Sequence, residues 1–270
     1  MEPSMFGFPI EIKKHVWPFG DEFIKEDIVP LLNGFFGHLK SQVFPYEFYE
    51  VTRPDYGLVR PVTVLSTPIN DRRSYYTIRI TAQPDSSTEI GLDLPAYQKY
   101  RIEQLVQTLQ DHFPTIYFIE SNRFLIVMQH FVFFPVCQFN RFIDIFNLLK
   151  IMWLASNSRV LLDYNQNHWL TSENGRLYYT DKDFMGNFYL DRDEALGANI
   201  NQAMIFLTTE NCNFLPQALR KFASLGSNQA EFVKSFKKIL KRYITSCQAQ
   251  QELSEGLQLK LKCLSKVYGE

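Results

Sequence analysis

The organisation of this chain is set by residues 161–170, which read Leu-Leu-Asp-Tyr-Asn-Gln-Asn-His-Trp-Leu, and by residues 175–184, which read Gly-Arg-Leu-Tyr-Tyr-Thr-Asp-Lys-Asp-Phe. An apolar run ends on Asp163, a polar loop follows, and a hydrophobic pair opens a strand. The dipeptide Asn174-Gly175 favours a tight hairpin turn, and the returning strand leads to Asp181. We therefore expect a β-hairpin that brings the two acids to one mouth.

The polar loop supplies further candidate ligands, because Asn167 and His168 lie between the two acids in the sequence. Carboxylate and amide oxygens are the ligands that Mg²⁺ prefers. The hairpin therefore predicts a divalent metal site that handles a phosphate. A structural alternative stays open, in which Asp163 and Asn165 only cap a turn and the later acids of the hairpin are solvated.

The composition is that of a globular protein. Of the 270 residues, 46% are hydrophobic and 21% charged, and a formal net charge of −1 makes no global electrostatic case for binding nucleic acid or an anionic membrane. The apolar runs, such as 124–128 and 131–136, are too short to span a bilayer. The first residues, Met1 to Ser4, lack the basic and apolar regions of a signal peptide. We expect a soluble, cytoplasmic protein with no membrane partner.

The cysteines and histidines are scattered along the chain. The four cysteines show no C-x-x-C spacing, so the sequence predicts neither a structural zinc site nor a disulfide framework. We expect buried free thiols in a reducing compartment. The five histidines share no spacing that would indicate a zinc site.

The first half of the chain is predicted to be rich in β-strands. Residues 1–43 form an N-terminal extension, irregular up to about residue 20 because prolines interrupt it, with a helix over 21–39 that Pro30 ends or kinks. Residues 44–134 form a β-rich lobe that begins with a three-stranded antiparallel meander. The expected elements are strands at 48–52, 61–66 and 75–81, a helix from 94 or 95 to 112, and strands at 116–120 and 124–129.

Residues 135–270 are predicted to be helical, apart from the hairpin at 160–186. Helical spacing of apolar residues predicts a largely buried helix over 139–154, followed after the hairpin by helices at 191–207, 216–225, 229–245 and 252–267. The helix at 229–245 is amphipathic, and its basic face is expected to be solvated, with RNA or partner docking as the alternative. Strands first and helices later indicate an α+β fold in two lobes.

This order of elements resembles the protein-kinase-like superfamily, in its small aminoglycoside-phosphotransferase and RIO-type members. The resemblance covers about residues 44–250 by element order, and its specific motifs are confined to 160–186. It implies a two-lobed kinase-like fold, with an antiparallel five-stranded sheet and one helix in the N-terminal lobe and a helical C-terminal lobe. It also implies that the nucleotide ATP is bound with Mg²⁺ between the lobes.

The resemblance assigns roles on the hairpin residue by residue. Asp163 is similar to the catalytic-loop Asp that accepts the proton of the acceptor hydroxyl. Asp181, 18 residues later, is similar to the metal-holding Asp, and the pair Asp183-Phe184 is an alternative for that motif. The metal-binding Asn corresponds to Asn167 after a one-residue deletion, with His168 as the lesser option.

The resemblance also implies a phosphate contact in the first lobe. The family's strand lysine corresponds to Arg79, and its acidic partner on the following helix to Glu103. The chain departs from the family in three places. Arg79 carries a planar guanidinium where the family has the compact ammonium of a lysine. Leucines precede Asp163, and only Gly57 is available for a glycine-rich phosphate loop.

Two activities follow from this resemblance. One is transfer of the ATP γ-phosphate to a hydroxyl of a small molecule or a protein. The other is a catalytically inactive pseudokinase that acts as a protein-binding or scaffold module, which the departures favour. A third possibility is an α+β interaction protein unrelated to kinases.

Overall fold

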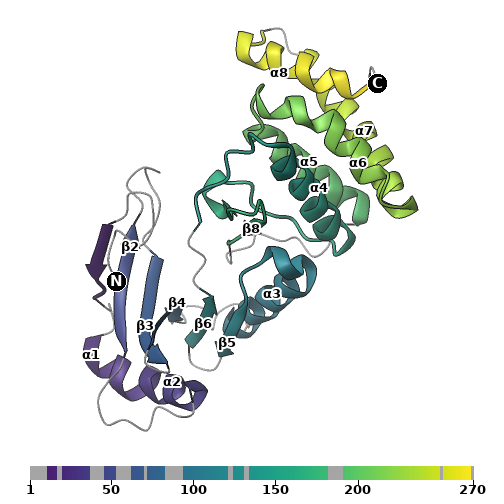
Figure 1. Ribbon diagram of the computed structural model, residues 1–270. Helices are drawn as coiled ribbons and strands as arrows, with labels where there is room; N and C mark the ends of the chain where they lie inside the picture. Colours follow the sequence, from purple (N-terminus) through teal and green to yellow (C-terminus); the bar gives the residue numbers. More distant parts are fainter. Residues whose placement is uncertain are drawn as a thin grey trace. The chain divides into compact units, whose positions relative to one another are not determined.

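The computed structural model describes residues 11–16, 20–36, 46–52, 62–69, 72–82, 94–120, 124–130, 134–181, 191–249 and 252–268 (Figure 1). The chain divides into two compact units. We call Met1–Arg101 with Pro114–Phe133 the sheet unit, and Ile102–Phe113 with Phe134–Glu270 the helical unit. Helix α3, Leu94–Leu109, contributes residues to both.

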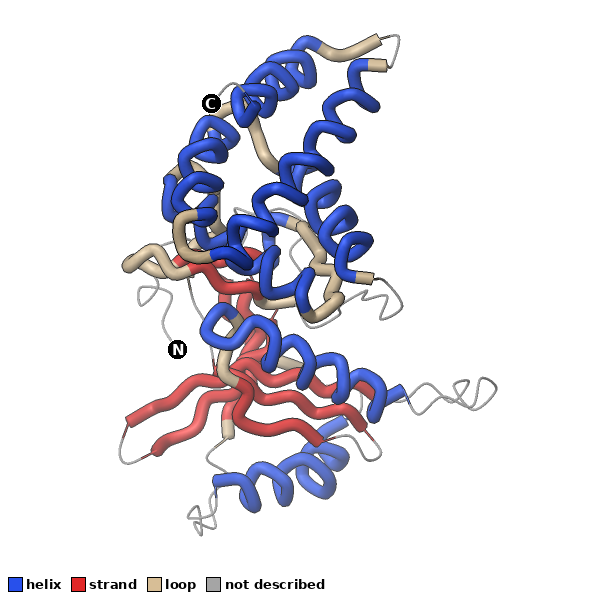
Figure 2. Tube along the Cα trace, turned by 90° about the vertical axis from the view of Figure 1, so that its right-hand side faces the viewer, coloured by secondary structure: helices blue, strands red, loops and turns tan. Residues whose placement is uncertain are grey.

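Among the residues that the structure describes, the sheet unit is built on a six-stranded antiparallel sheet with the strand order β1-β2-β3-β4-β6-β5 (Figure 2). The fold is therefore α+β, as predicted, and the predicted meander is its β2-β3-β4 portion. The expectation of five strands is wrong. The strands are β1 Glu11–Lys14, β2 Glu47–Thr52, β3 Val62–Ile69, β4 Arg72–Ala82, β5 Ile116–Glu120 and β6 Phe124–His130.

The additional strand is β1, in the part of the chain that was expected to be irregular. It pairs antiparallel with β2, with Ile12 opposite Val51, and the backbone N–H of His15 continues the ladder to the carbonyl of Phe48 at 3.0 Å. Four residues between prolines are too few to give a period-2 signal. The hydrogen bonds to β2, and not the local sequence, determine this strand.

One helical segment covers one face of the sheet (Figure 2). It starts with α1, Gly20–Phe23, continues as a π-helical turn over Ile24–Ile28, and ends with α2, Val29–Phe36. Pro30 does not end this segment, which runs on to Phe36, and the helix departs from regular α geometry in the π-helical turn directly before Pro30. The apolar side chains that pack together are Ile24, Ile28, Leu32 and Phe36 from the helices and Leu65, Ile78, Ile126 and Met128 from the strands.

The helical unit contains the helices predicted for the second half, with ends that differ by a few residues. Helix α4 packs on α5 and α6, and α7 contacts α5, α6 and α8. No helix among the described residues is long and apolar enough to cross a membrane. The elements are the 3₁₀ turn Gln110–His112, α4 Phe142–Asn157, α5 Arg192–Phe206, the 3₁₀ turn Asn211–Phe214, α6 Leu215–Ala223, α7 Ser227–Gln248, α8 Glu255–Ser265 and the 3₁₀ turn Lys266–Tyr268.

The predicted hairpin lies in the same unit, as β7, Trp169–Thr171, and β8, Leu177–Tyr179. Gly175 in its turn has φ of 81°, a left-handed conformation that glycine adopts without strain. The preceding chain adds a third backbone partner, because the N–H of Cys137 donates to the carbonyl of Trp169 at 2.7 Å. As predicted, the turn at Asn174-Gly175 joins two antiparallel strands.

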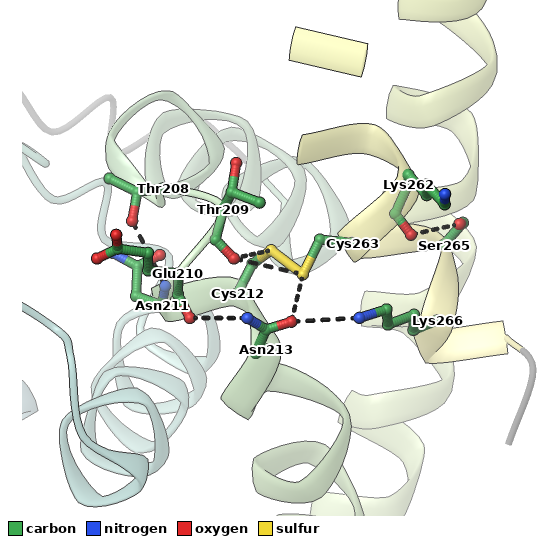
Figure 3. The surroundings of a disulfide bond; sticks show 10 residues. All are labelled: Thr208, Thr209, Glu210, Asn211, Cys212, Asn213, Lys262, Cys263, Ser265 and Lys266. Carbon is green, nitrogen blue, oxygen red and sulfur yellow. Dashed lines mark hydrogen bonds between the residues drawn. A yellow bond between two sulfur atoms is a disulfide. The ribbon is translucent and has the colours of Figure 1, made fainter. Parts of the chain in front are cut away.

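A disulfide joins Cys212, in the 3₁₀ turn before α6, to Cys263 of α8, with their Cα atoms 6.3 Å apart (Figure 3). The same two segments are also joined through Asn213, whose side-chain oxygen accepts a hydrogen bond from Lys266 Nζ at 3.3 Å. The prediction of free thiols is wrong for this pair and holds for Cys137 and Cys247. A sequence separation of 51 residues gives no local sign that the two cysteines meet.

Removing this disulfide is expected to destabilise the protein. The double substitution Cys212→Ser and Cys263→Ser should lower the free energy of unfolding by about 4 kcal/mol, because a loop of about 50 residues regains its freedom in the unfolded chain. Urea unfolding followed by circular dichroism measures the effect, and Cys247→Ser, at a half-buried free thiol, is the control. An unchanged midpoint in the double variant would contradict the prediction.

Candidate functional site

The loop that carries Asp163 is held in place by one buried side chain, Asn199 of α5. Its amide nitrogen donates to the carbonyls of Val160 and Ala195, each at 2.8 Å. Its oxygen accepts from the backbone N–H of Leu162 and from the hydroxyl of Tyr164, each at 3.1 Å. Every hydrogen-bonding position of this amide is therefore used, and the loop is fixed on both sides of Leu162.

From Asp163 onward the loop turns on its own side chains. One carboxylate oxygen of Asp163 accepts the N–H of Asn165 at 2.9 Å, and the Asn165 side chain in turn accepts the N–H of Asn167 at 3.2 Å. The 3₁₀ turn Gln166–His168 follows, and the N–H of His168 returns to the carbonyl of Asn165 at 3.0 Å. The turn-capping role expected as the structural alternative is thus present, and it uses only one oxygen of Asp163.

An aromatic core supports the loop from below. Trp169 and Tyr179 are fully buried, with ring centroids 5.0 Å apart, and Tyr164 stacks on Trp169 at 5.4 Å. The loop therefore rests on a rigid packed base, which limits how far its polar side chains can move.

Three side chains meet above this base: Asp163, His168 and Asp181. His168 Nδ1 lies 3.3 Å from Asp163 Oδ2 and 3.7 Å from Asp181 Oδ2. One ligand atom from each residue lies within 4.8 Å of the other two, a spacing that would allow all three to hold one metal ion. The predicted meeting of Asp163 and Asp181 near one mouth of the hairpin is confirmed, and their role as base and metal ligand stays a prediction.

The charges of this cluster are compatible with a bound cation. Two carboxylates approach the same imidazole nitrogen, and His168 Nδ1 is shielded from water without a well-aligned hydrogen bond to the described residues. An imidazolium proton or a divalent cation would each compensate the two acids. The chemistry of the donors, two carboxylates and one imidazole, fits a divalent metal.

The Tyr179 hydroxyl connects the two acids from below. It accepts the backbone N–H of Asp163 at 2.9 Å and donates to Asp181 Oδ2 at 3.4 Å. Burial, with the nearby charge of Asp181 adding to it, raises the pKa of Tyr179 well above its ordinary value. The hydroxyl therefore stays protonated and keeps Asp181 directed toward Asp163.

The other predicted site residues are distributed over both units. Asn167 is half-buried in the 3₁₀ turn, one residue before His168. Arg79 is half-buried on β4 opposite Val127, in the sheet unit, whereas Glu103 is exposed on α3, in the helical unit. The alternative pair Asp183-Phe184 and Gly57 lie outside the described residues.

Two residues that build the site were not predicted, Asn199 and Tyr179. Tyr179 belongs to a strand pattern in which an aromatic residue is ordinary, so nothing marks its hydroxyl as a link between the acids. Asn199 is the buried one of the two asparagines in α5. Asparagine has a low helix propensity, so its presence in a helix is a weak sign of a special role, but the sequence does not say which of the two has it.

Comparison with known proteins adds no family to these observations. A scan against protein-family models finds no match for this chain, and a search of the curated proteins finds no relative. Function is therefore inferred from the side chains and their geometry.

Asn199 provides a test of how the loop is held. Asn199→Ala is expected to lower the free energy of unfolding by about 3 kcal/mol, because it leaves the Leu162 N–H, the Val160 carbonyl and the Tyr164 hydroxyl buried without their partner. Asn201→Ala, at an exposed position of the same helix, is the control and should change stability by less than about 0.5 kcal/mol. Chemical denaturation measures both, and equal effects would show that the Asn199 amide does not fix the loop.

Proposed function

We propose that this chain is a kinase-like phosphotransferase that uses ATP and Mg²⁺ to phosphorylate a hydroxyl of a small molecule or a protein. The observation that carries the proposal is that Asp163, His168 and Asp181 each offer a ligand atom within 4.8 Å of the others, beside the open end of the hairpin. Phosphoryl transfer requires from the protein mainly positioning and compensation of charge, which such a cluster with a bound divalent cation supplies.

The order of elements supports the same proposal. Three antiparallel strands, β2 to β4, precede helix α3, and two further strands complete the sheet. The helical part then places the hairpin directly after its first long helix, α4. This is the order of elements on which the resemblance to kinases rests.

The exposure of the two acids suggests how their roles divide. The side chain of Asp163 is 43% exposed, so an acceptor hydroxyl can reach it and pass its proton to the carboxylate. The side chain of Asp181 is only 11% exposed and receives the Tyr179 hydroxyl, which suits a fixed metal ligand. We assign Asp163 as the base and Asp181 as the principal metal ligand.

His168 is proposed as the second protein ligand of the metal, because its Nδ1 lies 3.7 Å from Asp181 Oδ2. An imidazole nitrogen suits a transition-metal ion better than Mg²⁺, which prefers oxygen donors. Asn167 is the other candidate, as expected from the kinase pattern. When bound, the divalent cation neutralises the phosphates and orients them for transfer. The phosphate contact of Arg79 and its acidic partner Glu103 stay predictions of the kinase resemblance.

A non-catalytic pseudokinase is the second candidate, and the position of His168 favours it. A protonated imidazole at 3.3 and 3.7 Å from the two carboxylates would balance them without any metal. The hairpin would then be a structural ion cluster, and a surface elsewhere would bind a protein partner. Nucleotide binding separates the two candidates.

Nucleotide binding is expected to raise thermal stability. At a hundredfold excess of Mg-ATP over its dissociation constant, binding contributes about 2.7 kcal/mol. Asp181→Asn should abolish the metal-dependent part, whereas Glu173→Gln, at an exposed acid of the same hairpin, should retain it. A thermal-shift titration with ATP, with and without Mg²⁺, measures this. No shift with saturating nucleotide would refute the phosphotransferase and favour the pseudokinase.

The choice between His168 and Asn167 is open to a direct metal measurement. We expect His168→Ala to weaken Mn²⁺ binding tenfold or more, which corresponds to about 1.4 kcal/mol or more, and Asn167→Ala to leave it nearly unchanged. Titration of Mn²⁺ followed by the electron paramagnetic resonance of the free ion gives both constants. The opposite ranking would restore Asn167 as the ligand.

A further inference from the structure

The charges of this chain are unevenly distributed along it. From the start of α6 to the end of η8, residues 215–268, the sequence has ten lysines and arginines against three aspartates and glutamates, whereas residues 1–214 have 18 against 25. The formal net charge of −1 is therefore the balance of an acidic first part and a basic last part. Such asymmetry within one chain is typical of proteins that bind a polyanion or an anionic surface.

The basic residues of this part are concentrated on α7, a helix of 22 residues. Four of its cationic side chains are exposed and stand three or four residues apart, a spacing that places them on one side of the helix. We call these four the basic stripe: Lys234, Lys238, Lys241 and Arg242. The stripe extends over about 12 Å of the helix axis, and the half-buried Lys237 borders it.

The apolar side chains of α7 are used within the protein. The buried residues of this helix are Phe232, Val233, Phe236, Leu240 and Ile244. Every exposed residue of α7 is polar or charged. The stripe therefore has no apolar side chain with which to enter a membrane or to form the buried centre of a protein interface. It also has no exposed aromatic ring on which the bases of a single strand could stack.

The positive charges of the stripe are not compensated by acids. Like charges four residues apart on a helix repel one another, and a helix face that is merely solvated is typically laced with charges of both signs. Glu231, the one acid in the sequence of α7, lies a turn before Lys234. Neither it nor any residue of the stripe takes part in an ion pair between residues that the structure describes. A polyanion laid along this face would relieve the repulsion.

We propose that the basic stripe of α7 binds the phosphate backbone of a nucleic-acid duplex, without reading its bases. A duplex carries one negative charge per about 1.7 Å of its axis, so a row of cations along it finds many phosphate partners and releases bound counterions. Contacts to phosphates require only cations and N–H donors, which this face offers. The proposal does not rest on phosphotransfer, because α7 contributes no residue to the cluster of Asp163, His168 and Asp181.

The test is the binding of a short fluorescent DNA duplex to the full chain, measured by anisotropy over a range of potassium chloride concentrations. We expect the affinity to fall steeply as the salt concentration rises. The triple substitution Lys234→Gln, Lys238→Gln and Lys241→Gln should reduce the slope of log K against log salt by about 0.9 for each lost phosphate contact. The corresponding triple arginine variant keeps the charges and should bind like the unchanged protein. Glutamine and arginine both favour helix, so α7 is retained in each variant.

The matched control is Lys13→Gln, Lys14→Gln and Lys25→Gln, which removes the same charge from exposed positions of the sheet unit and should keep the slope. Three results would overturn the proposal: no salt-dependent binding, an equal loss in the control, or a clear preference for one base sequence. Tighter binding of a poly-glutamate peptide or of phosphatidylserine vesicles than of the duplex would also overturn it, since the stripe would then fit an acidic protein or a membrane better.

Discussion

The side-chain amide of Asn199 is the constraint on which the candidate site depends. A loop packed into a protein interior must find partners for its backbone N–H and carbonyl groups, and here one buried amide provides them on both sides of Leu162. It also anchors Tyr164, whose ring stacks on Trp169. Helix α5 therefore determines where Asp163 stands, although the two are far apart in the chain. A polar network that is fully satisfied in this way favours one arrangement of the loop over its alternatives.

Local signals predicted most of the elements. Apolar spacing located the helices of the second half, and Asn174-Gly175 located the hairpin, because both depend on residues close together in the chain. The errors arise where distant segments decide. Strand β1 exists because β2 offers it a ladder, and Cys212 meets Cys263 because α8 returns to the start of α6. Such contacts leave no periodicity in the sequence.

The candidate site was predictable only in part: the two acids were expected to meet, but not the side chains that join them. The spacing of Asp163 and Asp181 across a hairpin indicated that they would meet, and they do. Which neighbour joins them was not predictable, because it depends on the path of one 3₁₀ turn. The bond from the His168 N–H to the Asn165 carbonyl fixes that path and brings the imidazole to the acids. The hydroxyl of Tyr179, which links the backbone N–H of Asp163 to the carboxylate of Asp181, lies in a strand where the sequence suggests only packing.

Strand β1 has a consequence for how this protein behaves among its own copies. Terminal strands of a sheet present unpaired backbone groups that can recruit another chain and start aggregation. β1 is one of the two ends of this sheet, it is only four residues long, and its exposed side chains are Glu11, Lys13 and Lys14. A second molecule that added a strand here would have to place its own chain beside these charges. The segment that extends the sheet therefore also protects it from growing further.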